Sequence, residues 1–206
     1  MGITISFQGT LNNTSLVQPL LEELTDISDT LHWEYDILNE DWSKPSTAKL
    51  TVNEDGAEII GDLSLKGISI SLHPDCESLD LYFDSEGNLT TPMSTILLNE
   101  GKITKDKLFS SVKTQFAPPD IHISIIKLLK YLKKRYMPDL KVFDEGDYWD
   151  TGDKKILIQK ISFINEKLDT LQEIIFDIEI ENADQYTSEQ LAKILEEKLR
   201  KGLEKN

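Results

Sequence analysis

Residues 47–90, TAKLTVNEDGAEIIGDLSLKGISISLHPDCESLDLYFDSEGNLT, carry the pattern that decides the fold. Short segments of alternating apolar and polar residues are separated by NEDG, KG, HPD and DSEGN. Alternation places every second side chain on one face of a strand, as it does for Leu79, Leu81 and Phe83, and the Gly, Pro, Asp and Asn residues between the segments favour tight turns. These features predict an antiparallel meander.

In the segment before the meander, the spacing of apolar residues predicts a strand, a helix and a second strand. The first residues alternate, with Ile3, Ile5 and Phe7 on one face, which predicts a strand. The apolar spacing then changes to a helical stripe that ends near Leu31, and Thr14 or Ser15 is expected to cap it. The following WEYDIL segment returns to alternation and predicts a strand.

The segment after the meander adds two short strands and a helix. Strands are predicted near 109–116 and 140–144, on either side of a helix from Asp120 to about Tyr136, whereas residues 92–112 are weakly patterned and are interpreted mainly as a connection. The predicted fold class is therefore α+β. Its antiparallel sheet comes mainly from residues 1–91 together with the two later strands, and helices cover it.

The C-terminal section is predicted to be helical. Its apolar residues recur at alternating spacings of four and three, which is a heptad pattern: Leu157, Ile161, Ile164, Leu168, Leu171, Ile175 and Ile178. This predicts a long helix over about 154–181. A second helix follows, with Thr187 and Gln190 in the register of a capping box. We expect a core domain over 1–152 and an antiparallel helical pair over 153–206 packed on it, as one domain overall.

The charge of the chain is concentrated in one half. Among 206 residues the net charge is −15; the first 100 residues contain eighteen acidic and three basic residues, and the remaining residues contain nineteen of each. An acidic half attracts basic surfaces and repels nucleic acids and anionic membranes, although the same charge also serves solubility. The one cysteine and the lack of a signal sequence or long apolar run predict a cytoplasmic protein.

Residues 144–153, DEGDYWDTGD, form the first stretch that could carry chemistry. Neither acidic register matches an EF-hand loop, so we expect no metal, although Asp144, Glu145 and Asp147 remain an alternative site for a hard cation. A glycine-containing turn with Asp150 or Asp153 capping the long helix explains the composition. A third interpretation is a binding site for a cationic group, formed by these carboxylates with Tyr148 and Trp149.

Residues 111–122, SVKTQFAPPDIH, form the second stretch. If it lies beside the 144–153 loop, His122 and Glu145 or Asp147 would form an acid–base pair, and Lys113 would hold an anionic intermediate. Gln115 adds an amide to the same predicted site. The alternative is an ordinary, partly exposed histidine near a helix cap.

Two other features invite functional interpretations that the sequence does not favour. His73 and Cys76 are close together, but a zinc site needs three or four ligands and few partners remain. Five basic residues on the 120–136 helix suggest nucleic acid binding, which the net charge and the missing aromatic pattern oppose. No phosphate-loop or dinucleotide motif is present, so we expect no cofactor.

Three functions are therefore expected in order of preference. The first is an acidic binding module, of the inhibitor or immunity type, whose N-terminal half docks a basic protein partner. The second is an enzyme or small-ligand-binding protein that uses the 113–122 corner and the 144–153 loop. The third is self-association through the C-terminal helices.

Overall fold

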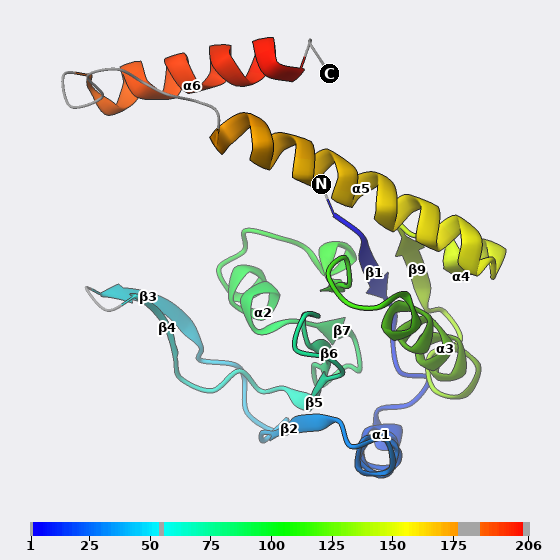
Figure 1. The fold of residues 1–206 in the computed structure, drawn as a ribbon. Helices are drawn as coiled ribbons and strands as arrows, with labels where there is room; N and C mark the ends of the chain where they lie inside the picture. The colour runs from blue at the N-terminus through cyan, green and yellow to red at the C-terminus, as the bar shows by residue number, and fades with distance from the viewer. Residues whose placement is uncertain (1, 54–55, 177–185, 204–206) are drawn as a thin grey trace. The chain divides into compact units, whose positions relative to one another are not determined.

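A computed structural model describes residues 2–53, 56–176 and 186–203. The chain divides into two compact units, one of residues 2–157 and one that begins at Ile158. The first unit combines antiparallel strands with helices, and the second unit is helical where it is described (Figure 1). The predicted α+β fold class is confirmed.

One sheet of the first unit has three antiparallel strands in the order β8 (Ser110–Lys113), β1 (Thr4–Gln8) and β9 (Lys141–Asp144). Ile5 of β1 faces Val112 on one neighbour and Asp144 on the other. Ile5 and Val112 are buried, which follows from the apolar face that alternation predicted. Because β1 separates β8 from β9, both predicted chemical stretches begin at strands that flank β1.

The second sheet contains the meander, in the order β2 (Glu34–Asn39), β5 (Lys66–Ser71), β6 (Leu79–Phe83) and β7 (Leu89–Thr90). A separate hairpin consists of β3 (Lys49–Asn53) and β4 (Gly56–Ile60). All pairings are antiparallel, as predicted. The strands before Thr91 nevertheless belong to three sheets rather than one, because pairing partners depend on contacts that alternation does not encode.

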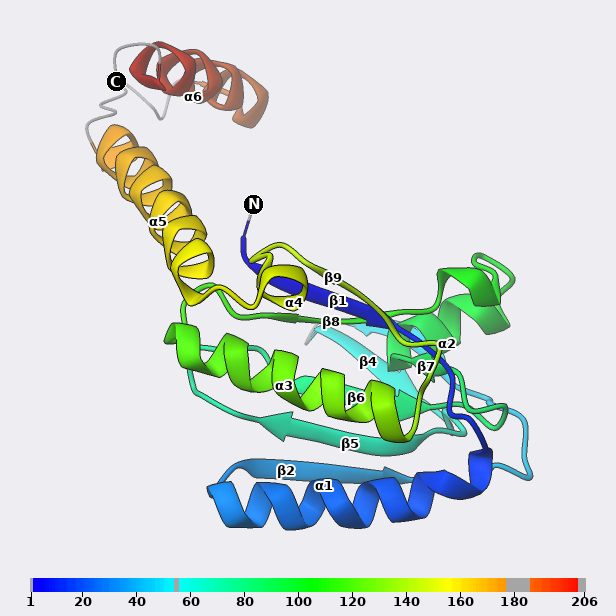
Figure 2. The same cartoon turned by 90° about the vertical axis from the view of Figure 1, so that its right-hand side faces the viewer.

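Two long helices run along the same side of the strands, α1 (Val17–Leu31) and α3 (Pro119–Arg135) (Figure 2). A 3₁₀ turn, η1 (Thr14–Leu16), precedes α1, and Asn13 caps this turn by accepting from Ser15 N, where Thr14 or Ser15 was expected to act as the cap. Leu20 and Leu24 of α1 and Ile125 and Leu129 of α3 join the buried residues of both sheets in one apolar cluster. This cluster is the core of the first unit.

Residues 92–112, predicted mainly as a connection, contain α2 (Pro92–Asn99) and the 3₁₀ turn η2 (Lys105–Lys107). Thr91 caps α2, because its hydroxyl accepts a hydrogen bond from Ser94 N at 3.1 Å. The Thr91–Pro92 pair is itself a helix-start signal, since Thr is a good cap and Pro fits the first helical position. This signal was present in the sequence, but the short helix lacks a clear apolar stripe.

The C-terminal helices are α5 (Lys154–Phe176) and α6 (Ser188–Leu203). Asp153 caps α5, as one of the two predicted caps, by accepting from Lys155 N at 2.7 Å. The predicted capping box of α6 is confirmed, because Gln190 accepts from Thr187 N and Thr187 accepts from Gln190 N. The last seam position, Ile178, lies outside the described residues. The expected antiparallel packing of the two helices stays a prediction.

Candidate functional site

The histidine of the predicted polar corner lies in a buried chain of three side chains. His122 Nδ1 lies 2.7 Å from the Thr114 hydroxyl oxygen, and His122 Nε2 lies 3.1 Å from Asp144 Oδ1 without regular hydrogen-bond geometry. The side chain of His122 is 0% exposed and that of Asp144 1%. The expectation of an ordinary, partly exposed histidine is therefore wrong, because α3 turns this face of its first turn inward.

The Asp144 carboxylate organises the loop that follows β9. It accepts hydrogen bonds from Gly146 N at 2.7 Å and Trp149 N at 2.8 Å. Burial on its own raises the pKa of Asp144, but the His122 imidazole and the two backbone donors outweigh this effect and hold the pKa below its ordinary value. A Cβ on Gly146 would approach Leu157 Cδ1 to 2.6 Å, so the loop is tightly packed at this point.

The other predicted residues of the 144–153 loop make structural contacts. Glu145 accepts a hydrogen bond from Thr4 N at 2.8 Å. Trp149 packs against the core, and the ammonium groups of Lys130 and Lys133 lie 5.4 and 5.8 Å from its ring centroid. Tyr148 also packs against the core, at the start of the short helix α4 (Tyr148–Thr151), and Asp147 precedes it with a φ of 57°. These contacts support the interpretation of this stretch as a turn and a cap.

Lys113 and Gln115 both approach Gly2, where an added Cβ would meet Gln115 Oε1 at 2.7 Å and Lys113 Cε at 2.8 Å. The Lys113 ammonium lies 5.3 Å from the centroid of the exposed Phe116 ring. Lys113 also lines an open hollow, whose other lining residues are Pro74, Asp75, Cys76, Glu77 and Phe116. Gln115 is buried. None of His122, Glu145 and Trp149 lines this hollow, and the binding role of the predicted site stays a prediction.

Cys76 has little thiolate character. Burial, together with the charge of Glu77, raises the pKa of its thiol to about 11, so the thiolate that nucleophilic chemistry requires is scarce at neutral pH. Among the residues that the structure describes, no group of three or more His, Cys, Asp or Glu side chains is arranged to hold a metal ion. No described helix combines the length and apolar character needed to cross a membrane.

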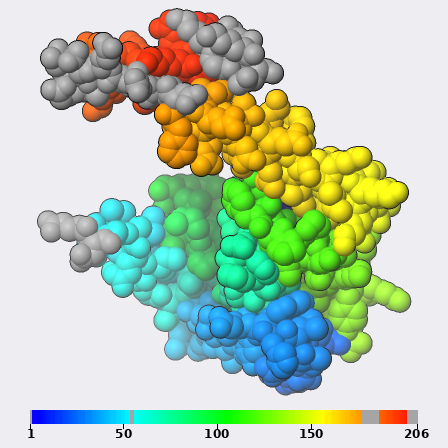
Figure 3. All heavy atoms as spheres, in the orientation of Figure 1, coloured from blue at the N-terminus to red at the C-terminus, as the bar shows by residue number. Residues whose placement is uncertain are grey.

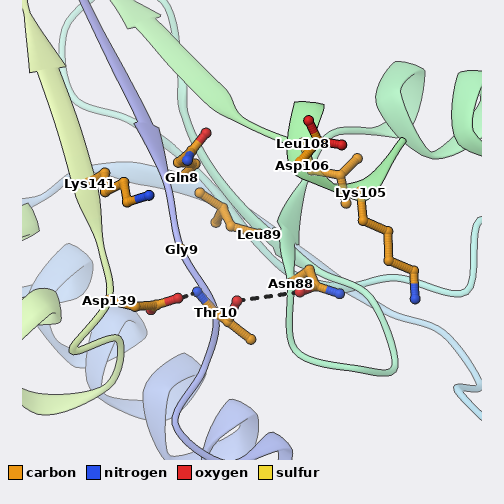
Figure 4. Close-up of a pocket in the computed structure, with 10 residues that line it drawn as sticks. All are labelled: Gln8, Gly9, Thr10, Asn88, Leu89, Lys105, Asp106, Leu108, Asp139 and Lys141. Carbon is orange, nitrogen blue, oxygen red and sulfur yellow. Dashed lines mark hydrogen bonds between the residues drawn. The ribbon is translucent and has the colours of Figure 1, made fainter. Parts of the chain in front are cut away.

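A hollow of about 190 Å³ lies where β1 leaves its sheet (Figure 4). Its polar groups hold the two sheets together: Asp139 accepts from Thr10 N at 3.0 Å, and the Thr10 hydroxyl donates to Asn88 Oδ1 at 3.3 Å. Thr10 and Asn88 also form an isolated backbone bridge. Lys105 at the rim forms an ion pair with Glu86. Because these groups already have partners, we assign the hollow a structural role.

A different feature lies where α1 and β2 form one continuous area of the surface (Figure 3). We call it the acidic α1–β2 surface and define it by five exposed carboxylates: Glu22, Asp26, Asp29, Glu34 and Asp36. Within the described ranges none of the five forms an ion pair with a lysine or arginine. The acidic residues of the first half that do form ion pairs with a lysine or arginine are different ones: Glu23, Asp41, Glu86 and Glu100.

Glu23, on the same helix, is an acidic residue whose charge is compensated by neighbouring side chains. Arg135 lies 3.4 Å from its carboxylate, and the hydroxyls of Tyr131 and Tyr136 both donate to it. These hydrogen bonds lower the pKa of Glu23. Glu22 accepts a hydrogen bond from Gln18 at 3.0 Å and has no ion pair with a described lysine or arginine. Adjacent residues of one helix thus differ, because one side of α1 faces α3 and the other faces solvent.

An apolar groove separates α1 from β2 within this surface. Its volume is about 370 Å³, and its lining residues are Gln18, Leu21, Glu22, Thr25, Asp26, Ile37 and Asn39. Ile37 remains 51% exposed although it is a large apolar residue. The acidic α1–β2 surface therefore combines uncompensated carboxylates with an apolar floor, and it is the candidate functional site. The sequence located its charge in the N-terminal half but did not show which acids lack partners.

Comparisons with family models, curated proteins and solved structures find no match to this chain.

Proposed function

We propose that the protein is an acidic binding module that docks a basic protein partner through the acidic α1–β2 surface. The observation that carries the proposal is the set of five exposed carboxylates that have no lysine or arginine partner among the described residues, two of which, Glu22 and Asp26, line an apolar groove. Carboxylates whose charge is already neutralised contribute little to an approaching cation, whereas uncompensated ones attract it over about a Debye length.

The groove favours the proposal that this surface binds a protein partner rather than only diffuse counterions. Charge complementarity accelerates encounter and selects the partner, while an apolar side chain that enters a groove supplies much of the binding free energy. Ile37, which lines the groove and is 51% exposed, offers such an apolar contact. An inhibitor or immunity protein acts in this way, and we place it in the cytoplasm, where its one cysteine stays reduced.

The enzyme interpretation receives less support. A general acid–base residue must reach the proton that it transfers. His122 is 0% exposed, and its neighbours Thr114 and Asp144 are buried with it. We therefore assign these residues to the stability of the loop after β9 rather than to catalysis.

The experiment uses the partner captured from host lysate and then purified. Its dissociation constant is measured at low and moderate salt for the wild type, for the double variant Glu22→Gln, Asp26→Asn and for Glu58→Gln. The control Glu58 lies on the hairpin β3–β4, which points away from α1 (Figure 1). We expect weaker binding at higher salt and a loss of about 2- to 10-fold for the double variant only. Salt-independent binding, or an equal effect of Glu58→Gln, contradicts the proposal.

A second candidate, self-association of the C-terminal helices, is favoured by one observation. Two seam residues of α5, Leu168 and Ile175, are 37% and 55% exposed, although a heptad seam normally faces another helix. We expect sedimentation at high protein concentration to show oligomers for the wild type and for Gln172→Glu. The double variant Leu168→Glu, Ile175→Glu should sediment as a monomer. A monomeric wild type contradicts this proposal.

A further inference from the structure

The outer edge of β2 offers unpaired backbone groups. β2 lies at the end of the four-stranded sheet, and among the described strands it pairs with β5 alone. Glu40 N donates to Leu65 O at 3.0 Å, and hydrogen-bonded pairs alternate along an antiparallel ladder. Glu34, Asp36 and Leu38 therefore direct their N–H and C=O groups toward β5.

The intervening residues direct their backbone groups away from the sheet. These residues are Tyr35, Ile37 and Asn39, and in the described part of the chain their backbone groups have no hydrogen-bond partner outside the ladder. The same alternation, followed through β5 and β6, predicts that Asp84 N points toward β7, and Asp84 N does donate to Asn88 O there at 3.1 Å. The assignment of the free edge is thus consistent across the sheet.

The side chains beside this edge are acidic on both faces of the sheet. Ile37 and Asn39 line the groove together with α1, so the odd-numbered residues of β2 face α1, where Glu22 and Asp26 lie. Successive side chains of a strand point to opposite faces, so Glu34 and Asp36 lie on the other face. The side chains of a strand added beside β2 would meet carboxylates on both faces of the sheet. On the face that is covered by α1 they would also meet the apolar groove.

We infer that the partner contributes an extended segment that adds a strand to the edge of β2, with apolar side chains entering the groove and Lys or Arg side chains facing Glu34 and Asp36. This inference rests on the proposed function and deepens it. Main-chain hydrogen bonds supply affinity in such strand addition, and alternate side chains supply specificity. A second copy of this chain fits poorly, because its own Glu34 and Asp36 would lie opposite like charges.

The probe is a short peptide of alternating Lys and Val, compared with a peptide of the same composition in which all Lys residues precede all Val residues. At low salt we expect the alternating peptide to bind about tenfold more tightly than the block peptide. At saturation it should slow hydrogen exchange of the Tyr35, Ile37 and Asn39 amides at least several-fold in the wild type. Unchanged exchange of these three amides in the bound protein overturns the inference.

A matched pair of variants isolates the backbone donor. Ile37→Pro removes the outward N–H without removing a bond to β5, and an edge strand tolerates proline. Ile37→Ala removes the same side chain but keeps the N–H. We expect Ile37→Pro to bind the alternating peptide about tenfold more weakly than Ile37→Ala. Circular dichroism verifies that both variants fold.

The outcomes separate this inference from the proposed function. Equal affinity of Ile37→Pro and Ile37→Ala, combined with salt-sensitive binding that Glu34→Gln and Asp36→Asn weaken, overturns strand addition and leaves the acidic docking surface standing. Binding that neither salt nor these charge variants affect overturns both.

Discussion

At the scale of single residues, the stretch that looks most like a catalytic loop is held by a structural carboxylate. Asp144 joins the His122 imidazole to the backbone of Gly146 and Trp149. A buried carboxylate is costly unless hydrogen bonds and charge compensate it, and here both do. The concentration of Asp and Gly residues in this loop is thus explained by backbone geometry and capping.

The buried chain of Thr114, His122 and Asp144 should matter for stability. His122→Ala leaves a cavity and removes the imidazole from beside the buried Asp144 carboxylate, so we expect it to lower the free energy of unfolding by about 3 kcal/mol. Thr114→Val keeps the shape and removes the hydrogen bond to Nδ1, with an expected loss of about 1 kcal/mol. Urea denaturation measures both. A loss below about 0.5 kcal/mol for His122→Ala would show that the contact is unimportant.

The lowered pKa of Asp144 predicts a dependence of stability on pH. Because its folded-state pKa lies below its ordinary value of 3.8, the ionised form stabilises the fold. This contribution is fully present above the unfolded-state pKa and is lost as the pH falls through the folded-state pKa. Urea denaturation between neutral pH and about pH 3 should therefore show a steeper loss for the wild type than for Asp144→Asn. Parallel curves would contradict this assignment.

At the scale of elements, α1 serves two purposes on two sides. Leu20 and Leu24 are buried in the core, and Glu23 connects the helix to α3 through Arg135 and two tyrosines. Glu22 and Asp26 face solvent beside the groove. Helical spacing makes this division possible, because residues three and four apart share a side.

The neighbours Glu22 and Glu23 provide a matched comparison for this division. Glu23→Gln removes the charge that Arg135, Tyr131 and Tyr136 compensate, and the site is part-buried, so we expect a loss of about 1 kcal/mol in the free energy of unfolding. Glu22→Gln should change it by less than about 0.5 kcal/mol. Chemical denaturation of both variants at neutral pH tests this order, and the reverse order would contradict the separate roles.

At the scale of the whole molecule, net charge sets conditions on both stability and association. The chain carries −15, and the five carboxylates of the acidic α1–β2 surface are exposed, with no lysine or arginine partner in the part of the chain that the structure describes. Mutual repulsion among them opposes the folded state while keeping the surface ready for a cation. A protein selected only for stability would gain from mixing charges of both signs in this region.

Salt should therefore stabilise the free protein. Raising the salt concentration from about 0.01 M to about 0.1 M shortens the Debye length from about 30 Å to about 10 Å. We expect the thermal unfolding midpoint to rise by about 2–4 °C, which corresponds to about 1 kcal/mol. The triple variant Glu22→Gln, Asp26→Asn, Asp36→Asn should respond less. Equal salt dependence of wild type and variant would show that the repulsion lies elsewhere.

Local patterns in the sequence determined the type of most elements. Alternation identified the meander strands, the helical stripe identified α1, and Thr187 and Gln190 marked the start of α6. Such signals depend on residues that are close together in the sequence, so they can be recognised without the tertiary structure. The helix α2 was missed because its eight residues carry a cap but no clear stripe.

Only the tertiary structure decided which distant residues meet. Alternation does not state that the strands before Thr91 divide among three sheets, and the acid-rich loop does not state that Asp144, rather than Glu145 or Asp147, lies against His122. Likewise, composition located the negative charge, but the packing of α3 against α1 compensates Glu23 and leaves Glu22 exposed. Contacts between residues far apart in the chain depend on how whole elements pack, and this packing minimises the exposed apolar area of the entire fold.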